Sequence, residues 1–394
     1  MRYISADYIF TSVSQPIKNG VITVDDGGTI LKVESSISEV KNNQSKIEHH
    51  KGIICPGFIN THCHLELSHL RSKISESTGM TGFIKELISK RANFSNNEIQ
   101  QAIADAEAEM IKNGIVAVGD ISNNSNTFKQ KSKSNLLYHT FIEVFDLNLG
   151  KAEDVFKNAL ELRSELNDIS HSSIVPHAPY TVSEKLFELI SDYAIKNKSL
   201  ISIHNQESEG ENELFISGSG VMADTFIAMG IDISQIRKTG KNSLLSTLPL
   251  LPSKTKTLLV HNTYTSREDM QFVNRQSSIN NFFWCTCPNA NMFIENKLPN
   301  YQFFINENAR VTIGTDSLAS NWTLSVLDEL KTITKHFSGI PLQTLLVWAT
   351  KNGADFLGFD QLGTIEKGKC PGLNLLKNVE GLKISEKTEV VKLV

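Results

Sequence analysis

Eight short apolar runs recur along the middle of the chain, and segments with helical periodicity separate them. In one such segment, Ile99, Ile103, Ala106 and Met110 fall on a single helical face. Repeated strand–helix units favour a parallel sheet, and eight of them favour a closed (β/α)8 barrel. The eight runs lie at residues 53–59, 115–120, 136–144, 174–176, 200–203, 256–260, 281–284 and 310–313. The middle of the chain therefore predicts an α/β barrel.

Both ends of the chain have a different pattern, with short apolar segments and glycine-containing turns. Residues 21–24 and 29–33 flank Asp25-Asp26-Gly27-Gly28, which predicts a hairpin. Residues 363–394 have the same β character. We therefore expect a small β-sandwich built from residues 1–55 and 363–394, with the barrel at 56–362. The segment 205–255 is too long for one crossover and predicts an extra helical excursion.

Composition excludes several classes of protein. The net charge is −4, so nothing suggests a basic groove for nucleic acid. No apolar run reaches the length of a membrane helix, and the first residues lack the apolar core of a signal peptide. Five cysteines are too few and too scattered for a disulfide framework. We expect a cytoplasmic protein with no membrane contact.

Metal-competent side chains follow the predicted strands at the point where each strand ends. His62 and His64 are two residues apart after the first run, and residues i and i+2 of a strand share a face. Catalytic groups of a (β/α)8 barrel lie at the C-terminal ends of its strands. The other strand-end residues are His177, His204 with Glu207 three residues later, His261 and Asp316. Their recurrence predicts a metal-dependent active site.

The same motifs resemble a known superfamily. The order Pro56-Gly57-Phe58-Ile59-Asn60 with His62-x-His64, then Pro176-His177-Ala178-Pro179-Tyr180, His204-x-x-Glu207, His261 and Gly314-Thr315-Asp316 is similar to the amidohydrolase superfamily, in its cytosine, adenosine and guanine deaminase-like branch. The details Leu65-Glu66-Leu67-Ser68 and Asp316-Ser317-Leu318-Ala319-Ser320-Asn321 further resemble aminodeoxyfutalosine and S-adenosylhomocysteine deaminases.

The resemblance implies a metal-dependent hydrolase that acts on non-peptide carbon–nitrogen bonds. His62, His64, His204 and Asp316 are expected to bind one divalent ion, zinc first, with iron(II) or manganese(II) as alternatives. The fourth predicted strand has no lysine to bridge a second ion. The implied reaction is deamination of an aminated purine or nucleoside-like substrate by metal-bound hydroxide, with aminodeoxyfutalosine as the leading candidate.

The resemblance also implies individual roles. Glu207 is expected to protonate the ring nitrogen, His261 to orient the hydroxide, and Asp316 to relay a proton to ammonia. His177, Ser320 and Glu66 are expected to contact the substrate, a small molecule. Homodimerisation is common in the family, so a homodimer is a further expectation.

The sequence also allows other functions and other interpretations of single residues. The same scaffold could hydrolyse a cyclic amide or an aryl chloride, or serve as a non-enzymatic metal-binding protein. Glu207 lies in an acidic stretch that could form a solvated helix face, and Pro176 and Pro179 alone could explain a rigid loop at His177. The small zinc deaminases are excluded, because the chain lacks their His-x-Glu and Pro-Cys-x-x-Cys signatures in usable order.

Overall fold

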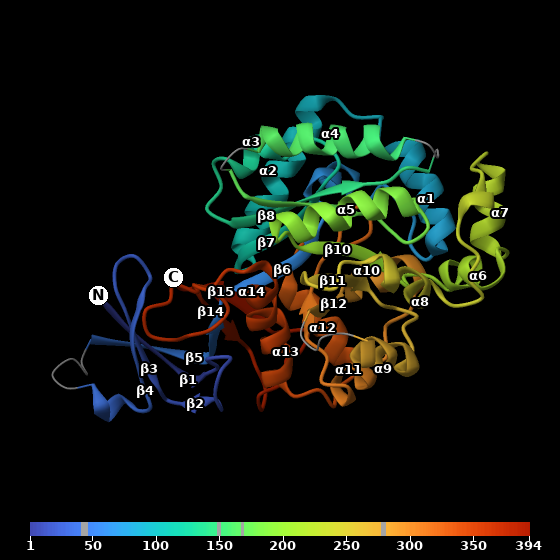
Figure 1. Cartoon of the computed structure of the whole chain (residues 1–394). Helices are drawn as coiled ribbons and strands as arrows, with labels where there is room; N and C mark the ends of the chain where they lie inside the picture. Colours follow the sequence, from blue (N-terminus) through green and yellow to red (C-terminus); the bar gives the residue numbers. More distant parts are fainter. Residues whose placement is uncertain (41–45, 148–150, 167–168, 277–280) are drawn as a thin grey trace.

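The computed structural model describes residues 1–40, 46–147, 151–166, 169–276 and 281–394. It has two parts (Figure 1). Strands from both ends of the chain form a sheet at one end of the molecule, next to the N- and C-termini. The larger part contains parallel strands surrounded by helices. The alternation of strands and helices predicted for the middle of the chain is therefore present.

The terminal part is a seven-stranded sheet whose order is β15-β14-β5-β1-β3-β4, with β2 paired to β1. The predicted hairpin is confirmed, because β3 pairs with β4 in antiparallel register. The C-terminal strands join the N-terminal ones through β14, which pairs with β5. The strands are β1 (Arg2–Ile9), β2 (Ile17–Lys18), β3 (Val21–Val24), β4 (Ile30–Glu34), β5 (Ile47–Pro56), β14 (Leu373–Lys377) and β15 (Glu389–Lys392).

The larger part contains two four-stranded parallel sheets, with orders β6-β7-β8-β9 and β10-β11-β12-β13. The sheets meet at both edges: the N–H of His204 donates to the carbonyl of His177 at 3.0 Å, and that of Thr315 to the carbonyl of His62 at 3.0 Å. All eight predicted runs contain strand. These are β6 (Phe58–Cys63), β7 (Ile115–Ser122), β8 (Leu137–Val144), β9 (His171–Pro176), β10 (Ile201–Asn205), β11 (Thr257–His261), β12 (Phe282–Thr286) and β13 (Val311–Ile313).

The first apolar run, residues 53–59, was predicted to be one strand, and this prediction is wrong. It is divided at Gly57 into the end of β5 and the start of β6, which belong to different sheets. A Cβ at Gly57 would lie 2.4 Å from Cγ1 of Val116 and 2.8 Å from the carbonyl oxygen of Pro371. Glycine is therefore required where the chain passes between its two parts, because both parts pack closely against the backbone there.

Helices cover the parallel strands. The predicted helical face at residues 99–110 lies in α2, which begins at a capping box formed by Ser95 and Glu98. The main helices are α1 (Gly79–Lys90), α2 (Asn96–Lys112), α4 (Ala152–Glu165), α5 (Glu184–Asn197), α9 (Arg267–Gln276), α10 (Pro288–Glu295), α12 (Val326–His336), α13 (Leu342–Ala349) and α14 (Lys351–Leu357). No helix in the described ranges is long and apolar enough to cross a membrane.

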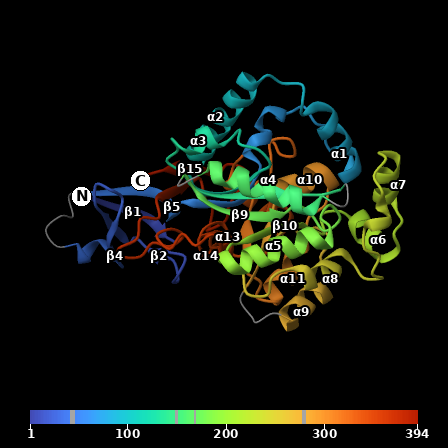
Figure 2. The ribbon, with the colours of Figure 1, turned by 45° about the horizontal axis from the view of Figure 1, so that its top comes forward.

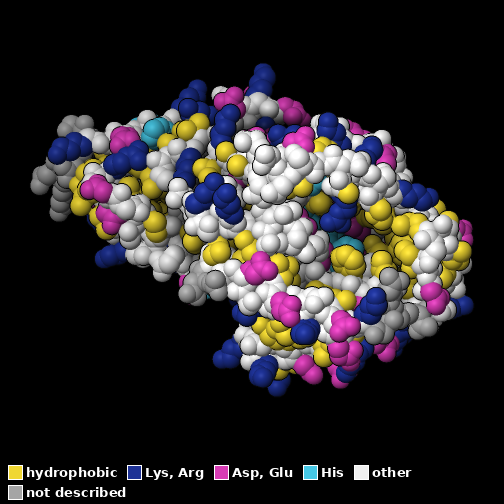
Figure 3. Space-filling view, turned by 90° about the horizontal axis from the view of Figure 1, so that it is seen from above, with side chains coloured by type: hydrophobic (Ala, Val, Ile, Leu, Met, Phe, Trp, Pro, Cys, Tyr) yellow, Lys and Arg dark blue, Asp and Glu magenta, His cyan; other side chains and the backbone are white. Residues whose placement is uncertain are grey.

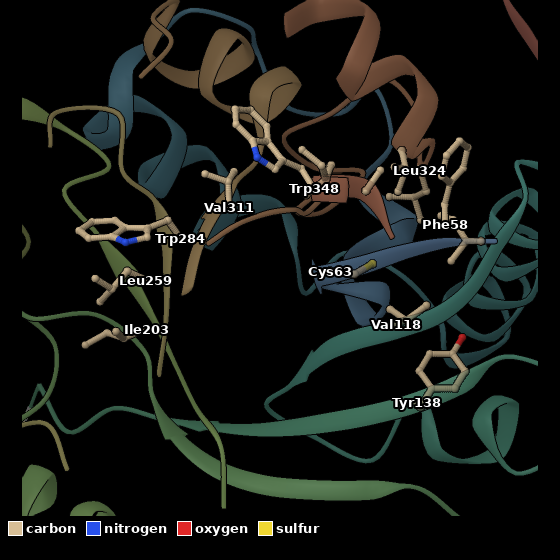
Figure 4. Packing of buried hydrophobic residues seen from close by; sticks show 14 of the residues in the cluster. Phe58, Cys63, Val118, Tyr138, Ile203, Leu259, Trp284, Val311, Leu324 and Trp348 are labelled. Carbon is tan, nitrogen blue, oxygen red and sulfur yellow. The ribbon is translucent and has the colours of Figure 1, made fainter. Parts of the chain in front are cut away.

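Alternation along the strands divides the core between two faces. Figure 4 shows Phe58, Val118 and Tyr138 among the buried residues on one face, together with Trp284 and Trp348. Side chains of the opposite face form a separate buried cluster, which includes Ile59, Ala117, Phe141, Leu258 and Phe283. Neighbouring residues of one strand thus belong to different clusters, as expected for strands buried on both faces. The strands are held from both sides, which gives their ends a rigid base.

The predicted excursion at 205–255 is confirmed as helical. It contains α6 (Glu209–Ser217), α7 (Val221–Ala228) and α8 (Ser243–Thr247). Figures 1 and 2 show α7 and α1 side by side at the end of the molecule farthest from the termini. The excursion thus stands beside the C-terminal ends of the strands.

Candidate active site

The strand ends bring the predicted metal-competent side chains together. His62 and His64 come from the end of β6, His204 from β10, and Asp316 from the segment after β13. His62, His64 and His204 form one group of donor atoms within 4.8 Å of one another, and His62, His261 and Asp316 form another. All five side chains are buried. The two groups share His62, so they belong to one site.

The donor atoms face one another directly. Nε2 of His64 lies 3.1 Å from Nε2 of His62. Oδ1 of Asp316 lies 3.6 Å from Nε2 of His62 and 3.4 Å from Nε2 of His64. The ring of His204 stands 5.0 Å from that of His62 and 5.5 Å from that of His64, measured between centroids. Two nitrogens and one carboxylate oxygen therefore point into one small space.

Protonation states at this cluster suit a cation. Burial lowers the pKa of His64 to about 4 and holds the pKa of His204 well below its ordinary value. Burial opposes ionisation of Asp316, yet its hydrogen bond to His62 and the surrounding histidine charges outweigh burial and hold its pKa well below the usual range. For His64 and His204 burial thus favours the neutral imidazole, and for Asp316 its neighbours favour the ionised carboxylate; these are the forms that bind metal ions.

Hydrogen bonds fix the orientation of two rings. Nδ1 of His204 donates to the carbonyl of His177 at 2.7 Å, which leaves Nε2 of His204 free to accept. Nδ1 of His261 lies 2.9 Å from Oδ1 of Asn291. Since an amide oxygen only accepts, Nδ1 carries the proton and Nε2 of His261 is the acceptor. Both rings thus present a lone pair, one toward the metal cluster and one toward Glu207.

The backbone at the site is held in a conformation that costs energy. His261 has φ 72° and Asp316 has φ 56°, both in the left-handed region that non-glycine residues rarely adopt. Each such residue costs on the order of 1–3 kcal/mol and persists only where the surroundings determine it. At these two positions the left-handed conformation directs the side chain of the strand end into the cluster.

Glu207 lies in the same site, and its surroundings favour the protonated form. Its Oε1 is 3.4 Å from Nε2 of His261. Burial, reinforced by the charges of Asp316, Glu211 and Glu295, raises its pKa well above the ordinary value of 4.5. A solvated helix face is therefore the wrong interpretation of this residue, because Glu207 precedes α6 and is buried. The chain thus places next to the histidine cluster a carboxyl group whose raised pKa favours the neutral acid.

A cavity of about 300 Å³ opens onto these groups. His64, His204, His261, Glu207 and Asp316 all line it. Figure 3 shows histidine side chains within a hollow whose surroundings include hydrophobic side chains. The apolar walls come mainly from α1 and α7, through Leu67, Met80, Phe83, Ile84, Leu87, Ile88, Phe226 and Met229. The volume suits a small-molecule ligand.

The three residues expected to contact substrate have different positions. His177 lines the cavity, and its Nδ1 is 2.9 Å from Oγ1 of Thr181. Ser320 is fully buried, and its hydroxyl donates to Oδ2 of Asp316. Glu66 is buried, accepts the N–H of Asn123 at 3.1 Å, and has its pKa raised by burial to about 8. Neither Ser320 nor Glu66 is among the described residues that form the cavity wall.

The structure adds residues that sequence reasoning missed. Glu143, near the end of β8, lines the cavity, and its Oε1 is 3.6 Å from Nδ1 of His204. The sequence could have identified Glu143, because it is a carboxylate next to the end of an apolar run, and catalytic groups of a barrel lie at the C-terminal ends of its strands. Asn123 donates to Oε2 of Glu143 at 3.0 Å. Asn291, which orients His261, lies within α10 and carries no local signal in the sequence.

The donor set fits a divalent ion of the zinc type. Imidazole nitrogens and one carboxylate oxygen are common zinc ligands. Burial by itself would lower the pKa of His62, yet Asp316 raises it, so the cluster attracts a positive charge in its centre. Glu143, His177 and His204 also form a donor group, but Nδ1 of His204 already donates to a carbonyl.

Comparison with known proteins identifies the family to which the chain is similar. The model of the Amidohydrolase family matches residues 53–393. An aminodeoxyfutalosine deaminase from Nitratiruptor is 28% identical over 359 residues, which cover 89% of this chain and 85% of the relative. An adenosine deaminase from Helicobacter pylori is 27% identical over 372 residues, which cover 89% and 87% of the two chains.

Solved structures share the fold. A Helicobacter pylori aminofutalosine deaminase in complex with methylthio-coformycin has a TM-score of 0.81 at 23% identity, with 97% of this chain and 94% of that chain covered. An adenosine deaminase from Xanthomonas campestris with bound zinc has a TM-score of 0.73 at 20% identity, with 95% and 84% covered. The likeness extends over nearly the whole chain.

Proposed function

Because the chain belongs to the amidohydrolase family and is a hydrolytic enzyme acting on carbon–nitrogen bonds, we propose that it deaminates an adenine-containing, nucleoside-like substrate. Water replaces the exocyclic amino group of the ring, and ammonia leaves. Aminodeoxyfutalosine is the leading candidate substrate, supported by the relative named for that activity and by the motif details around Glu66 and Ser320.

We propose that His62, His64, His204 and Asp316 bind one divalent ion, with zinc as the first choice and iron(II) or manganese(II) as alternatives. The support is the cluster of buried donors whose free atoms face one another. When bound, such an ion lowers the pKa of water to about 7, which makes hydroxide available at neutral pH. The absence of lysine from β9 (His171–Pro176) supports one ion rather than two.

The observation that carries the proposal is the neutral acid at Glu207 next to the donor cluster. Attack on an aromatic carbon requires the neighbouring ring nitrogen to accept a proton, because that nitrogen takes up the displaced electron pair. Glu207 lines the cavity, and its raised pKa favours the protonated acid that this step needs. A positioned acid of this kind typically accounts for a factor of about 10²–10⁴ in rate.

Two further residues complete the proton transfers. Nε2 of His261 is an acceptor facing Glu207 at 3.4 Å, so His261 can hold the attacking water in line by accepting its hydrogen. Asp316 is ionised and takes the proton released by that water. It then passes the proton to the departing amino group, which leaves as ammonia. The hydroxyl on the ring carbon returns its own proton to Glu207, which restores the acid and leaves a neutral carbonyl product.

The three residues that the sequence predicted to contact substrate have different proposed roles. His177 lines the cavity and is proposed to contact the part of the substrate beyond the ring. Glu66 accepts the backbone N–H of Asn123, a residue that lines the cavity, so we propose that Glu66 acts on the substrate by positioning Asn123. Ser320 donates to Asp316 and is proposed to orient it.

We also propose that the two parallel sheets form one closed (β/α)8 barrel at residues 56–362, and that residues 1–55 and 363–394 form a β-sandwich. The support is the contact of the sheets at both edges, through His204 with His177 and through Thr315 with His62. The pairing of β14 with β5 supports the joint terminal unit.

Ammonia release tests the function directly. The zinc-loaded enzyme is assayed on aminodeoxyfutalosine, S-adenosylhomocysteine, adenosine, guanine and cytosine, and chloride release from a chlorotriazine is measured in parallel. A strong signal on one adenine nucleoside is expected. Chloride release without ammonia release would favour the aryl chloride alternative, and silence on the whole panel would contradict deamination.

The Glu207→Gln variant tests the mechanism. It keeps the shape of the side chain but removes the acidic proton, so turnover is expected to fall by about 10²–10⁴ while zinc stays bound. Glu209→Gln, two residues away and exposed on α6, is the matched control and is expected to retain turnover. Near-normal turnover of Glu207→Gln would assign the acid to another residue.

A further inference from the structure

The acidic stretch that follows β10 alternates between buried and exposed side chains. Glu209 and Glu213 are exposed, whereas Glu207 and Glu211 are buried, and Glu211 is only 1% exposed. Glu207 is the proposed acid, but Glu211 is not among the described residues that line the cavity. A buried carboxyl group needs polar partners to offset its loss of hydration. The partners of Glu211 therefore indicate what this residue does.

The carboxylate of Glu211 binds the turn that leads to Glu207. Its Oε1 accepts the N–H of Gln206 at 2.9 Å and the hydroxyl of Ser243, and its Oε2 accepts the N–H of Glu207 at 3.1 Å. These hydrogen bonds oppose the effect of burial, which raises the pKa of Glu211 to about 7. One side chain thus fixes two successive backbone N–H groups, the second of them that of the proposed acid.

The turn directs Glu207 toward the site. In an extended strand, residues three apart point to opposite faces, so Glu207 would face away from His204. Gln206 interrupts the strand with φ 45°, in the left-handed region, and Oε1 of Glu207 lies 3.4 Å from Nε2 of His261. A residue other than glycine keeps this conformation only where its surroundings determine it. The hydrogen bonds to Glu211 are such a determinant.

Glu211 also has an ordinary structural explanation, because it is the third residue of α6 after the N-cap Ser208. In a capping box, a glutamate at this position accepts the N–H of the N-cap residue, as Glu98 does for Ser95 in α2. In α6 the carboxylate instead accepts from the two residues before Ser208. A role limited to the helix predicts a loss of stability and no dependence on the proposed acid.

We propose that Glu211 is a positioning residue of the deamination site, which holds the turn at Gln206 so that the carboxyl of Glu207 reaches the ring nitrogen of the substrate. This inference rests on the proposed function and extends it to a residue outside the cavity. The charge of Glu211 acts on the same carboxyl, since it adds to the effects of burial and Asp316 that raise the pKa of Glu207. Loss of Glu211 should therefore affect turnover only while Glu207 can act.

A double-mutant cycle tests this dependence. Glu211→Gln replaces one acceptor oxygen by an amide NH2 group, which cannot accept a backbone N–H. In the zinc-loaded enzyme, on the substrate that the ammonia assay selects, kcat is expected to fall about 10–100-fold with little change in KM. In the Glu207→Gln background, the same substitution is expected to lower kcat by less than about twofold. Glu213→Gln, at an exposed position of the same helix, is the matched control.

A second variant acts on Glu211 without changing α6. Ser243→Ala removes only the hydroxyl that donates to Oε1 of Glu211. Its loss of kcat is expected to be smaller than that of Glu211→Gln and to disappear in the Glu207→Gln background. This variant completes the cycle if Glu211→Gln does not fold.

Hydrogen–deuterium exchange resolved to single residues measures the turn without any activity. The amides of Gln206 and Glu207 are expected to exchange at least about tenfold faster in Glu211→Gln, because each loses or weakens its acceptor. Exchange in β10 should stay unchanged. The side chain of Gln206 is bound to Thr265 and Asp269 as well, so the loop is expected to remain folded.

The outcomes separate the two roles of Glu211. An equal fall in kcat in the wild-type and Glu207→Gln backgrounds would assign it a structural role and overturn the proposal, as would an unchanged kcat or an effect on KM alone. These outcomes leave deamination intact. If no substrate is deaminated, the proposed function fails, and exchange then decides about Glu211. Faster exchange at Gln206 and Glu207 would support its hold on the turn, and unchanged exchange would overturn it.

Discussion

The hydroxyl of Ser320 donates a hydrogen bond to Oδ2 of Asp316, while Oδ1 of the same carboxylate faces the Nε2 atoms of His62 and His64. One oxygen is thus held by the protein and the other is left for the proposed metal. Because φ of Asp316 is 56°, the backbone at this residue is strained, and Ser320 helps to hold its side chain in place.

The Ser320→Ala variant is expected to lower kcat or zinc affinity by about 10–100-fold, the usual effect of removing a partner of a metal ligand. KM for the nucleoside is expected to change little, because Ser320 is buried behind Asp316. Steady-state kinetics and zinc titration measure the two effects. A large increase in KM at normal kcat would instead show direct substrate contact.

The His64→Ala variant is expected to lose zinc and activity together, because Nε2 of His64 faces both His62 and Asp316. Zinc content per chain after dialysis, measured by mass spectrometry, checks this. His336→Ala, at an exposed position in the last turn of α12, is the control and should keep its zinc. Full zinc occupancy in His64→Ala would remove this residue from the site.

Glu207 predicts a pH-dependent contribution to stability. Its pKa is raised in the folded protein, so its proton is bound more tightly in the folded than in the unfolded chain. The resulting stabilisation is complete below the ordinary value of 4.5 and is lost as the pH rises through the folded-state pKa. The free energy of unfolding of the metal-free wild type should therefore fall with rising pH relative to Glu207→Gln. Urea titrations at several pH values measure this difference, and a pH-independent difference would contradict it.

Lys131 and Asp120 form an ion pair at 2.6 Å in which both side chains are fully buried. Oδ1 of Asp120 also accepts the N–H of Leu65 at 2.8 Å, directly after His64. Lys131→Met is expected to destabilise the protein by about 3–5 kcal/mol, because it leaves a buried carboxylate without its partner. The double variant Lys131→Met with Asp120→Asn should recover much of this loss. Denaturant unfolding measures both, and a single variant as stable as wild type would contradict the expectation.

Gly314 lies beneath the proposed metal site. A Cβ there would lie 2.8 Å from Cβ of His62 and 2.8 Å from the sulfur of Cys285. Gly314→Ala is therefore expected to destabilise the protein by about 1–3 kcal/mol and to weaken zinc binding by displacing His62. Gly339→Ala is the control, because nothing lies within 4 Å of its added Cβ. Thermal unfolding and zinc titration measure both variants, and unchanged zinc affinity in Gly314→Ala would show that His62 is not displaced.

Much of the fold and of the site could be predicted because the signals are local. The apolar runs, such as 115–120 and 256–260, predicted strands that begin and end within a few residues of the observed ones. The strand-end rule then selected His62, His64, His204, His261 and Asp316, which the structure brings together. The rule works because parallel strands all point the same way, so their ends gather at one rim.

Other features depend on contacts that no local pattern encodes. The division of the first apolar run at Gly57 follows from the approach of Val116 and Pro371, both remote in the chain. Asn291 orients His261 from a helix 30 residues away, and Asn123 links Glu66 to Glu143. These partners are defined only once the elements pack.

The sequence by itself determined which side chains can carry the chemistry, because residue types at strand ends depend only on chain order and strand direction. The tertiary structure decided what each of them does. It placed Ser320 behind Asp316, buried Glu207 so that the pKa of its carboxyl rises, and set the apolar face of α1 along the cavity that the catalytic groups line. The reason is physical: protonation, orientation and access depend on burial and on neighbours, and both arise from packing between distant segments.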